Sequence, residues 1–119
     1  MLKKTVLRRK SDFDLAYNKG KSFGERYLIL FIRKNSLSHN RIAFLASKKV
    51  GNSVKRNRAR RLMKESFREI KENLAEGYDI IFVARKTIND LKCHDVKKSL
   101  ESAVRKASAF KRSNIAGEA

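Results

Sequence analysis

Proline and tryptophan are absent from this 119-residue chain, and cysteine occurs once, as Cys93. A single cysteine excludes an internal disulfide and suits a reducing compartment, so we expect a cytoplasmic protein. The sequence has no run of about 18 apolar residues, so no transmembrane helix is expected. The basic N-terminal stretch lacks an apolar core, so we expect no secretory signal either.

Acidic residues are also scarce: 12 Asp and Glu stand against 30 Lys and Arg, which gives a formal net charge of +18. Self-repulsion on this scale destabilises a compact state, so the working state is expected to be a complex with a polyanion. Nucleic acid is the leading candidate, because neutralising its phosphates releases counterions. An anionic membrane surface is the alternative. The apolar fraction of 41% is ordinary, and the length predicts a single domain over residues 1–119.

The sequence lacks the residue groupings of an independent catalytic centre. Cys93 and His94 are adjacent, which is not the usual spacing of zinc ligands, and no second cysteine could complete a site. The few acids near helix starts and along one helix are more simply interpreted as helix-end and ion-pairing residues. No Gly-rich loop of the Walker type is present. We therefore predict no catalytic side chain and no protein metal site.

The N-terminal third predicts a helix followed by a strand. The helix is expected to begin at Ser11, because Ser11 and Asp14 have the spacing of a capping box, and to end at Gly20 in a left-handed conformation. Residues 23–34 have the apolar, β-favouring pattern of a strand, with a short extra strand possible near its start. Residues 1–10 and 111–119 are expected to be flexible.

Three further elements complete a predicted mixed sheet with helices packed on it. A short polar turn joins residues 41–47 to the preceding strand, which predicts an antiparallel hairpin. Residues 79–85 follow a helix over residues 53–76 directly, so they are predicted to run parallel to residues 41–47 in a βαβ unit. Asp95 is expected to cap the final helix, whose apolar stripe comprises Val96, Leu100, Ala103, Val104 and Ala107. The fold class predicted is α+β, a single-domain α/β sandwich, and the general preference would make its crossover right-handed.

The central helix carries the clearest functional signal. Asn52 or Ser53 is expected to cap it and Gly77 to follow its end. At 100° per residue, it has an apolar stripe, a basic face and a separate arc of acids. A merely solvated helix would mix the two signs of charge. The apolar stripe comprises Ala59, Met63, Ser66, Phe67, Ile70 and Leu74; the basic face comprises Asn57, Arg60, Arg61, Lys64, Arg68 and Lys71; the acids are Glu65, Glu69 and Glu72.

This basic face has the chemistry of a phosphate-binding surface. Arginine offers a planar fork of donors and lysine a point charge. Asn57 can both donate and accept, so it could reach a base edge or a sugar hydroxyl. Lys48 and Lys49 extend the positive region, and Gly51 permits a tight bend or a close approach of the backbone to a partner.

Four aromatic residues form a second candidate site. Phe13 and Tyr17 are four residues apart and share a helix face. Together with Phe31 and Phe110 they could line one groove, because aromatic rings flanked by cations bind single-stranded nucleic acid by stacking. Taken singly, each ring is more simply interpreted as part of the core. Alternation along residues 27–32 puts Tyr27, Ile29 and Phe31 on one sheet face and Leu28, Leu30 and Ile32 on the other; one face must pack on the basic helix, and the other could form the groove.

Residues 48–61 resemble the signature of the bacterial ribonuclease P protein family. The family pattern Lys-Lys-x-Gly-Asn, followed by Arg-Asn-Arg on a helix, stands here as Lys48-Lys49-Val50-Gly51-Asn52 and Arg56-Asn57-Arg58. The Ser-Asp-Phe helix start, the DIIFVAR strand with Arg85-Lys86 and the Lys-Lys-Ser-Leu helix fall in the family's order, so the resemblance covers roughly residues 3–113. It implies a left-handed βαβ crossover, against the general preference.

The resemblance also implies a function. Such proteins assist a catalytic RNA subunit that removes the 5′ leader of precursor tRNA with Mg²⁺, which we expect the RNA and substrate to hold. No membrane and no obligate protein partner are expected. The RNA subunit is expected at Lys48, Lys49, Asn52, Arg56, Asn57, Arg58, Arg60, Arg61, Lys64 and Arg68, and the leader at Phe13, Tyr17, Phe31 and, less directly, Phe110.

Departures from the family pattern are small. Tyr17 stands where Phe is usual and Phe31 where Tyr is frequent, so stacking survives but a hydroxyl contact at position 31 is lost. The alternatives are a basic protein that binds structured RNA or DNA without a role in cleavage, such as a ribosome-associated RNA binder. A helix that reads duplex DNA as part of a helix-turn-helix is disfavoured, because a strand directly precedes the basic helix.

Overall fold

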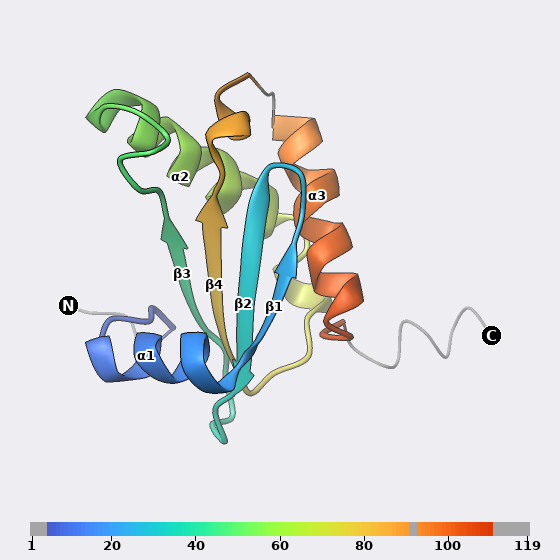
Figure 1. Cartoon of the computed structure of the whole chain (residues 1–119). Coiled ribbons are helices and arrows are strands. Elements are labelled where there is room, and N and C mark those ends of the chain that lie inside the picture. Colours follow the sequence, from blue (N-terminus) through green and yellow to red (C-terminus); the bar gives the residue numbers. More distant parts are fainter. Residues whose placement is uncertain (1–4, 91–92, 111–119) are drawn as a thin grey trace.

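The computed structural model describes residues 5–90 and 93–110, and Figure 1 shows the order of its elements. Within these residues three α-helices accompany one sheet of four strands. The elements are α1 (Lys10–Lys19), β1 (Lys21–Gly24), β2 (Leu28–Lys34), β3 (Arg41–Leu45), α2 (Ser53–Arg68), β4 (Tyr78–Ala84) and α3 (Cys93–Lys106), with 3₁₀ turns at Lys71–Asn73 and Lys86–Asp90.

The strand order is β1-β2-β4-β3. The prediction of parallel pairing between β3 and β4 is confirmed, and β1 is the short extra strand expected near Phe23. The predicted hairpin of β2 with β3 is wrong, because β4 lies between them and pairs antiparallel with β2. The physical reason is burial: β4 packs on both faces of the sheet, with Ile80 and Phe82 in one apolar cluster and Ile81 in the other. Its apolar run therefore takes a central position.

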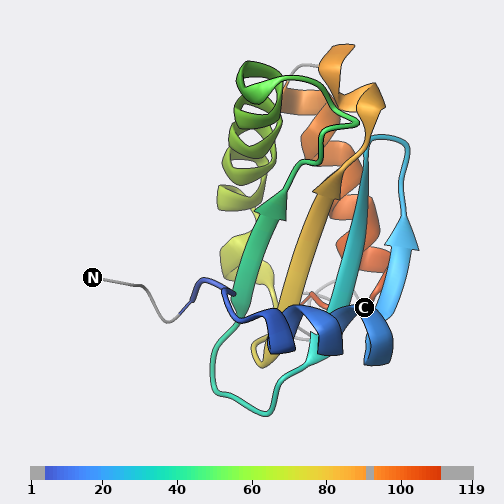
Figure 2. The same cartoon turned by 60° about the vertical axis from the view of Figure 1, so that its left-hand side comes forward.

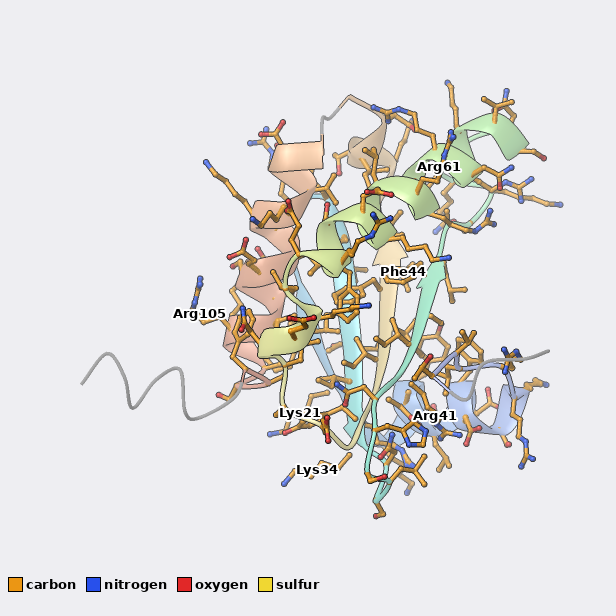
Figure 3. All side chains as sticks on the ribbon, turned by 180° about the vertical axis from the view of Figure 1, so that it is seen from behind. Lys21, Lys34, Arg41, Phe44, Arg61 and Arg105 are labelled. Carbon is orange, nitrogen blue, oxygen red and sulfur yellow. The ribbon has the colours of Figure 1, made fainter. Side chains whose placement is uncertain are left out.

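The two faces of the sheet are covered unequally. In Figures 1 and 2, α2 and α3 cover one face, whereas α1 crosses one end of the other. The main core lies under α2 and α3, where the predicted apolar stripes of both helices are buried. Seen from the α2 side, as in Figure 3, β4 lies to the left of β3 with both strands pointing up. The βαβ crossover is therefore left-handed, as the family resemblance implied.

The described part of the N-terminal segment begins at Thr5 and contacts the sheet. Val6 forms a parallel β-bridge with Ile42 at the outer edge of β3. The backbone N–H of Leu7 donates to the Ile42 carbonyl at 3.1 Å, and the Leu7 side chain is buried. The predicted flexibility of residues 1–10 is therefore wrong for residues 5–10, because their backbone completes an open strand edge. The rest of that prediction concerns residues 1–4 and 111–119, which lie outside the described residues.

Helix ends were predicted less well than helix bodies. Of the two caps proposed for α2, Asn52 is the one used: its side chain accepts a hydrogen bond from the Lys55 backbone N–H at 3.0 Å. The capping box at Ser11 is wrong, because α1 begins at Lys10 with no side-chain cap.

Three other predicted termini also need correction. Asp95 lies inside the first turn of α3, which starts two residues earlier. Gly77 has a positive φ of 93°, but α2 has already ended at Arg68 and a 3₁₀ turn intervenes. Gly20 is extended, not left-handed, with φ −84° and ψ −175°. Glycine is required at this position for a steric reason. A Cβ there would lie 2.4 Å from the Ala16 carbonyl oxygen and 2.5 Å from that of Ile32.

Candidate nucleic-acid interface

The basic face of α2 is a solvent-facing surface, as the helical wheel predicted. Ala59, Met63, Ser66 and Phe67 bury the opposite side of the helix. Figure 3 shows Arg61 projecting from α2 away from the sheet. Glu69 on the acidic arc pairs with Lys97 of α3 at 3.2 Å, so this acid faces α3. We call Asn57, Arg60, Arg61, Lys64 and Arg68 the α2 basic face.

Members of the α2 basic face differ in how they are held. Arg60 donates to Asn57 at 2.6 Å, and Arg68 pairs with Glu65 at 2.7 Å. Arg61 and Lys64 are exposed and have no acidic partner among the described residues. The two unpaired cations are therefore the groups most available to a polyanion.

The remaining predicted RNA-binding residues flank this face and are partly committed to the fold. Arg58 is half-buried and points its Nη1 at the carbonyls of Ile88 and Asn89, 3.5 and 3.4 Å away. Arg56 is also half-buried and donates to Ser53 Oγ at 3.2 Å. The loop before α2 bends at Gly51, whose φ of 142° favours glycine. Lys48 and Lys49 are exposed in this loop, while Asn52 is used as the cap.

Phe13, Tyr17 and Phe31, which we call the aromatic cluster, come together as predicted. The ring centroids of Phe13 and Tyr17 are 6.3 Å apart, and Tyr17 meets Phe31 edge-to-face at 4.8 Å. The cluster lies on the α1 face of the sheet. Tyr17 keeps 40% of its surface exposed, and its partial burial raises the pKa of the phenol above the usual 10.0. The ring is therefore neutral and open to a stacking partner.

Phe110 does not join this cluster, so the prediction of one groove lined by all four aromatic rings is wrong. Its ring packs against the core under α2 and α3, on the opposite face of the sheet, with Arg105 6.0 Å above it. Its backbone forms a bridge with Leu74. The sequence could not show this, because the end of α3 carries no signal of which sheet face the chain follows.

The sequence reasoning missed an apolar row on the open part of the α1 face. Ile29, Val83 and Leu45 are register partners across β2, β4 and β3, and each is half-buried. On β1, Gly24 is the register partner of Ile29 and so lies at the end of this row. A Cβ added at Gly24 would meet the Arg85 guanidinium at 3.0 Å and no other atom of the described residues. The only signal for the row was the alternation along each strand, which gives a face but not the neighbouring strand.

A groove of about 1240 Å³ at the edge of β3 is lined by residues of both candidate sites. Phe13 lines one end, and Arg60, Lys64 and Arg68 line the α2 wall. Phe44 forms part of the floor, where its ring stacks 5.8 Å from that of Phe82. One ring of the aromatic cluster and three residues of the α2 basic face therefore border the same groove.

Beside the aromatic cluster, Arg41 at the start of β3 joins two acids. Its Nε and Nη2 each lie 2.8 Å from an oxygen of Asp79, which is completely buried. Its Nη1 lies 3.2 Å from Asp12 of α1. The hydrogen bond with Asp79 and the charges of both acids raise the pKa of Arg41 beyond its ordinary value.

The described residues contain neither a group of metal ligands nor a membrane-spanning helix. Across residues 5–90 and 93–110, no three or more His, Cys, Asp or Glu side chains are grouped so that they could hold a metal ion. No helix in that part of the chain is long and apolar enough to cross a membrane.

Comparisons with known proteins agree on one family. Residues 1–108 match the family described as Ribonuclease P. The chain is 41% identical over 110 residues to the ribonuclease P protein component of Clostridium botulinum (strain Langeland / NCTC 10281 / Type F), covering 92% of this chain and 99% of that one. Among solved structures, the Staphylococcus aureus RNase P protein superposes with a TM-score of 0.82 at 31% identity, covering 92% and 100%. The Thermotoga maritima protein gives 0.77 at 28%, covering 85% and 96%.

Proposed function

This chain belongs to the ribonuclease P protein family, and from that premise we propose that it is the accessory subunit of an RNA-based endonuclease. In this proposal the RNA subunit cleaves precursor tRNA. The protein binds that RNA through the α2 basic face and its flanking residues, and it holds the 5′ leader over the aromatic cluster. The observation that carries the proposal is the groove at the edge of β3, which is lined both by Phe13 of the aromatic cluster and by Arg60, Lys64 and Arg68 of the α2 basic face.

The charge of α2 supports RNA docking. Arg61 and Lys64 are exposed without acidic partners in the described part of the chain, so a phosphate does not have to displace an internal ion pair. The helix itself is fixed by its buried stripe and by the Asn52 cap. A rigid cationic surface loses little conformational entropy when it binds.

Ring exposure supports leader binding. Tyr17 and Phe31 meet edge-to-face beside the half-buried apolar row of the sheet. Each stacked base is worth about 1–3 kcal/mol and requires no particular sequence. Stacking of this kind suits a leader whose sequence differs from one precursor tRNA to another.

The proposal assigns no Mg²⁺ ligand to this protein. The described residues contain no suitable group of three acids or histidines, so Mg²⁺ is expected on the RNA subunit and the substrate, where it would stabilise charge on phosphate. We also propose a cytoplasmic location, since the single cysteine suits a reducing compartment.

The decisive experiment is cleavage of a precursor tRNA by a ribonuclease P RNA at low Mg²⁺, with and without this protein. We expect the protein to increase kcat/KM for the precursor. An unchanged rate, with the protein folded and present in excess, would refute the proposal.

The alternative is a basic protein that binds structured RNA or DNA without a role in cleavage. Competition at moderate salt distinguishes it. If duplex DNA of equal length displaces the ribonuclease P RNA as well as unlabelled RNA does, the binding is general electrostatic attraction.

A further inference from the structure

The contact between α1 and the sheet depends on very few side chains. Ala16 is the only buried residue of α1, and the apolar cluster beneath it is small, with Leu7, Ala43 and Ile81 as its other buried members. An alanine has no side chain beyond Cβ, so its burial fixes the distance of α1 from the sheet better than its rotation. Phe13 is only partly buried against this cluster and Tyr17 contacts Phe31 at its exposed edge, so a polar contact on the Ala16 side of α1 would add to the packing that fixes the direction of the two rings.

Asp12 is placed to fix that rotation. It lies one turn before Ala16, on the same face of the helix, and its Oδ2 receives a hydrogen bond from Arg41 Nη1 at 3.2 Å. Phe13 directly follows Asp12, and Tyr17 directly follows Ala16. Both rings therefore lie about 100° around the helix from the face that carries Asp12 and Ala16. A change in the Asp12 contact therefore rotates both rings relative to Phe31.

Arg41 is rigid enough to serve as the fixed point. Two of its nitrogens bind the two oxygens of Asp79 at 2.8 Å each. Asp79 is fully buried in β4 and also accepts a hydrogen bond from Asn35 Nδ2 at 3.0 Å. The guanidinium plane is thus set by the sheet, and only its third nitrogen is directed to α1.

We propose that Asp12 and Arg41 are positioning residues for the 5′ leader: their ion pair sets the rotation of α1 and so holds Phe13 and Tyr17 at the stacking distance from the leader bases. This inference rests on the proposed function, since it assumes that the aromatic cluster binds the leader. Neither residue contacts the leader in this scheme; both act through the rings.

Charge makes the inference testable with matched variants. Asp12→Asn and Asp14→Asn each remove one negative charge from α1. Asp14 is exposed and forms no ion pair with another described residue. For a general polyanion effect both variants bind RNA slightly more tightly, because the protein becomes more cationic. If Asp12 is a positioning residue, Asp12→Asn weakens leader binding and Asp14→Asn does not. This is the opposite of the tighter binding that the change in charge alone would produce.

The experiment measures Kd for a precursor tRNA and for the mature tRNA, with the protein assembled on a ribonuclease P RNA. The Kd for mature tRNA divided by the Kd for precursor tRNA isolates the contribution of the leader. We expect Asp12→Asn to reduce this ratio about fivefold, the low end of the value of one stacked base, while Asp14→Asn leaves it unchanged. Equal ratios for the two variants would overturn the inference.

Two further measurements separate positioning from folding and from the parent proposal. In a Tyr17→Ala background, Asp12→Asn should reduce the ratio by much less, because residues acting through one another are non-additive. Full additivity would contradict the mechanism. If the wild type itself fails to distinguish precursor from mature tRNA, the proposed function fails; if it does distinguish them but Asp12→Asn has no effect, only the positioning role fails.

Discussion

Arg60 donates a hydrogen bond to Asn57 one turn earlier on α2, with Nη1 2.6 Å from Oδ1. The amide oxygen of Asn57 is therefore occupied within the protein, which leaves its NH₂ group to face a partner. Between Arg56 and Lys64 the exposed polar groups then present mainly donors. Phosphate oxygens accept only, so this arrangement suits an RNA backbone better than the edges of the bases.

Replacing Asn57 by Asp tests the donor surface. Asn57→Asp keeps an acceptor for Arg60 but substitutes a carboxylate oxygen for the outward NH₂ group. Loss of a charge-assisted hydrogen bond and addition of a repulsive charge should together reduce affinity for the RNA subunit at least about tenfold. Lys98→Gln, at an exposed position of α3, makes the same change in net charge away from this face. Equal losses for the two variants would indicate a general charge effect.

Arg61→Ala should weaken RNA binding and reduce the slope of log K against log salt by about one, the value of one phosphate contact. Lys34→Ala is the control, because Lys34 is exposed at the far end of the sheet in Figure 3. An unchanged slope for Arg61→Ala would exclude the α2 basic face as the docking surface.

Arg58→Ala is expected to differ, lowering thermal stability as well, because Arg58 also contacts the Ile88 and Asn89 carbonyls.

Tyr17→Ala should weaken precursor tRNA binding by about 1–3 kcal/mol and leave mature tRNA binding unchanged. Phe110→Leu removes an aromatic ring on the opposite face of the sheet and should change the binding of neither precursor nor mature tRNA.

Because the pKa of Tyr17 is raised above 10.0, the ring stays neutral as pH rises to that value. Its contribution should therefore be constant between about pH 6 and 9. A loss in that range would contradict stacking by a neutral phenol.

Gly20→Ala should destabilise the fold by about 3 kcal/mol, since a Cβ would meet two backbone carbonyl oxygens at 2.4 and 2.5 Å. Gly24→Ala is the matched control, because the only close atom there belongs to the flexible Arg85 side chain, at 3.0 Å. Urea unfolding of both variants measures the difference. Equal midpoints would show that the turn after α1 yields more easily than its geometry indicates.

The sequence was most informative where a single helix or strand decides the outcome. The buried stripe of α2, including Met63 and Phe67, and that of α3 follow from a 3.6-residue period and were predicted correctly. The parallel pairing of β3 and β4 follows from the helix between them. Alternation along β2 separated Phe31 from Leu28, Leu30 and Ile32, and the structure shows that Phe31 is on the face away from α2.

Relationships between distant segments were harder to predict. A short turn after β2 indicated a hairpin with β3, but the deeper burial of β4 placed β4 between them. No local pattern predicts the contacts between Asp12, Arg41 and Asp79. In the sequence, each is only a charged residue near the end of a helix or strand. Periodicity is the same for either hand of the crossover, so its direction came from the family resemblance alone.

The central place of β4 also determines when the protein can fold during its synthesis. Residues 28–45 leave the ribosome as two strands that do not pair with each other. The sheet cannot close until residues 78–84 have emerged, by which time the whole cationic helix is outside the exit tunnel. Such non-local pairing slows folding. A nascent chain interrupted before β4 would therefore display its RNA-binding residues without the scaffold that gives them their geometry.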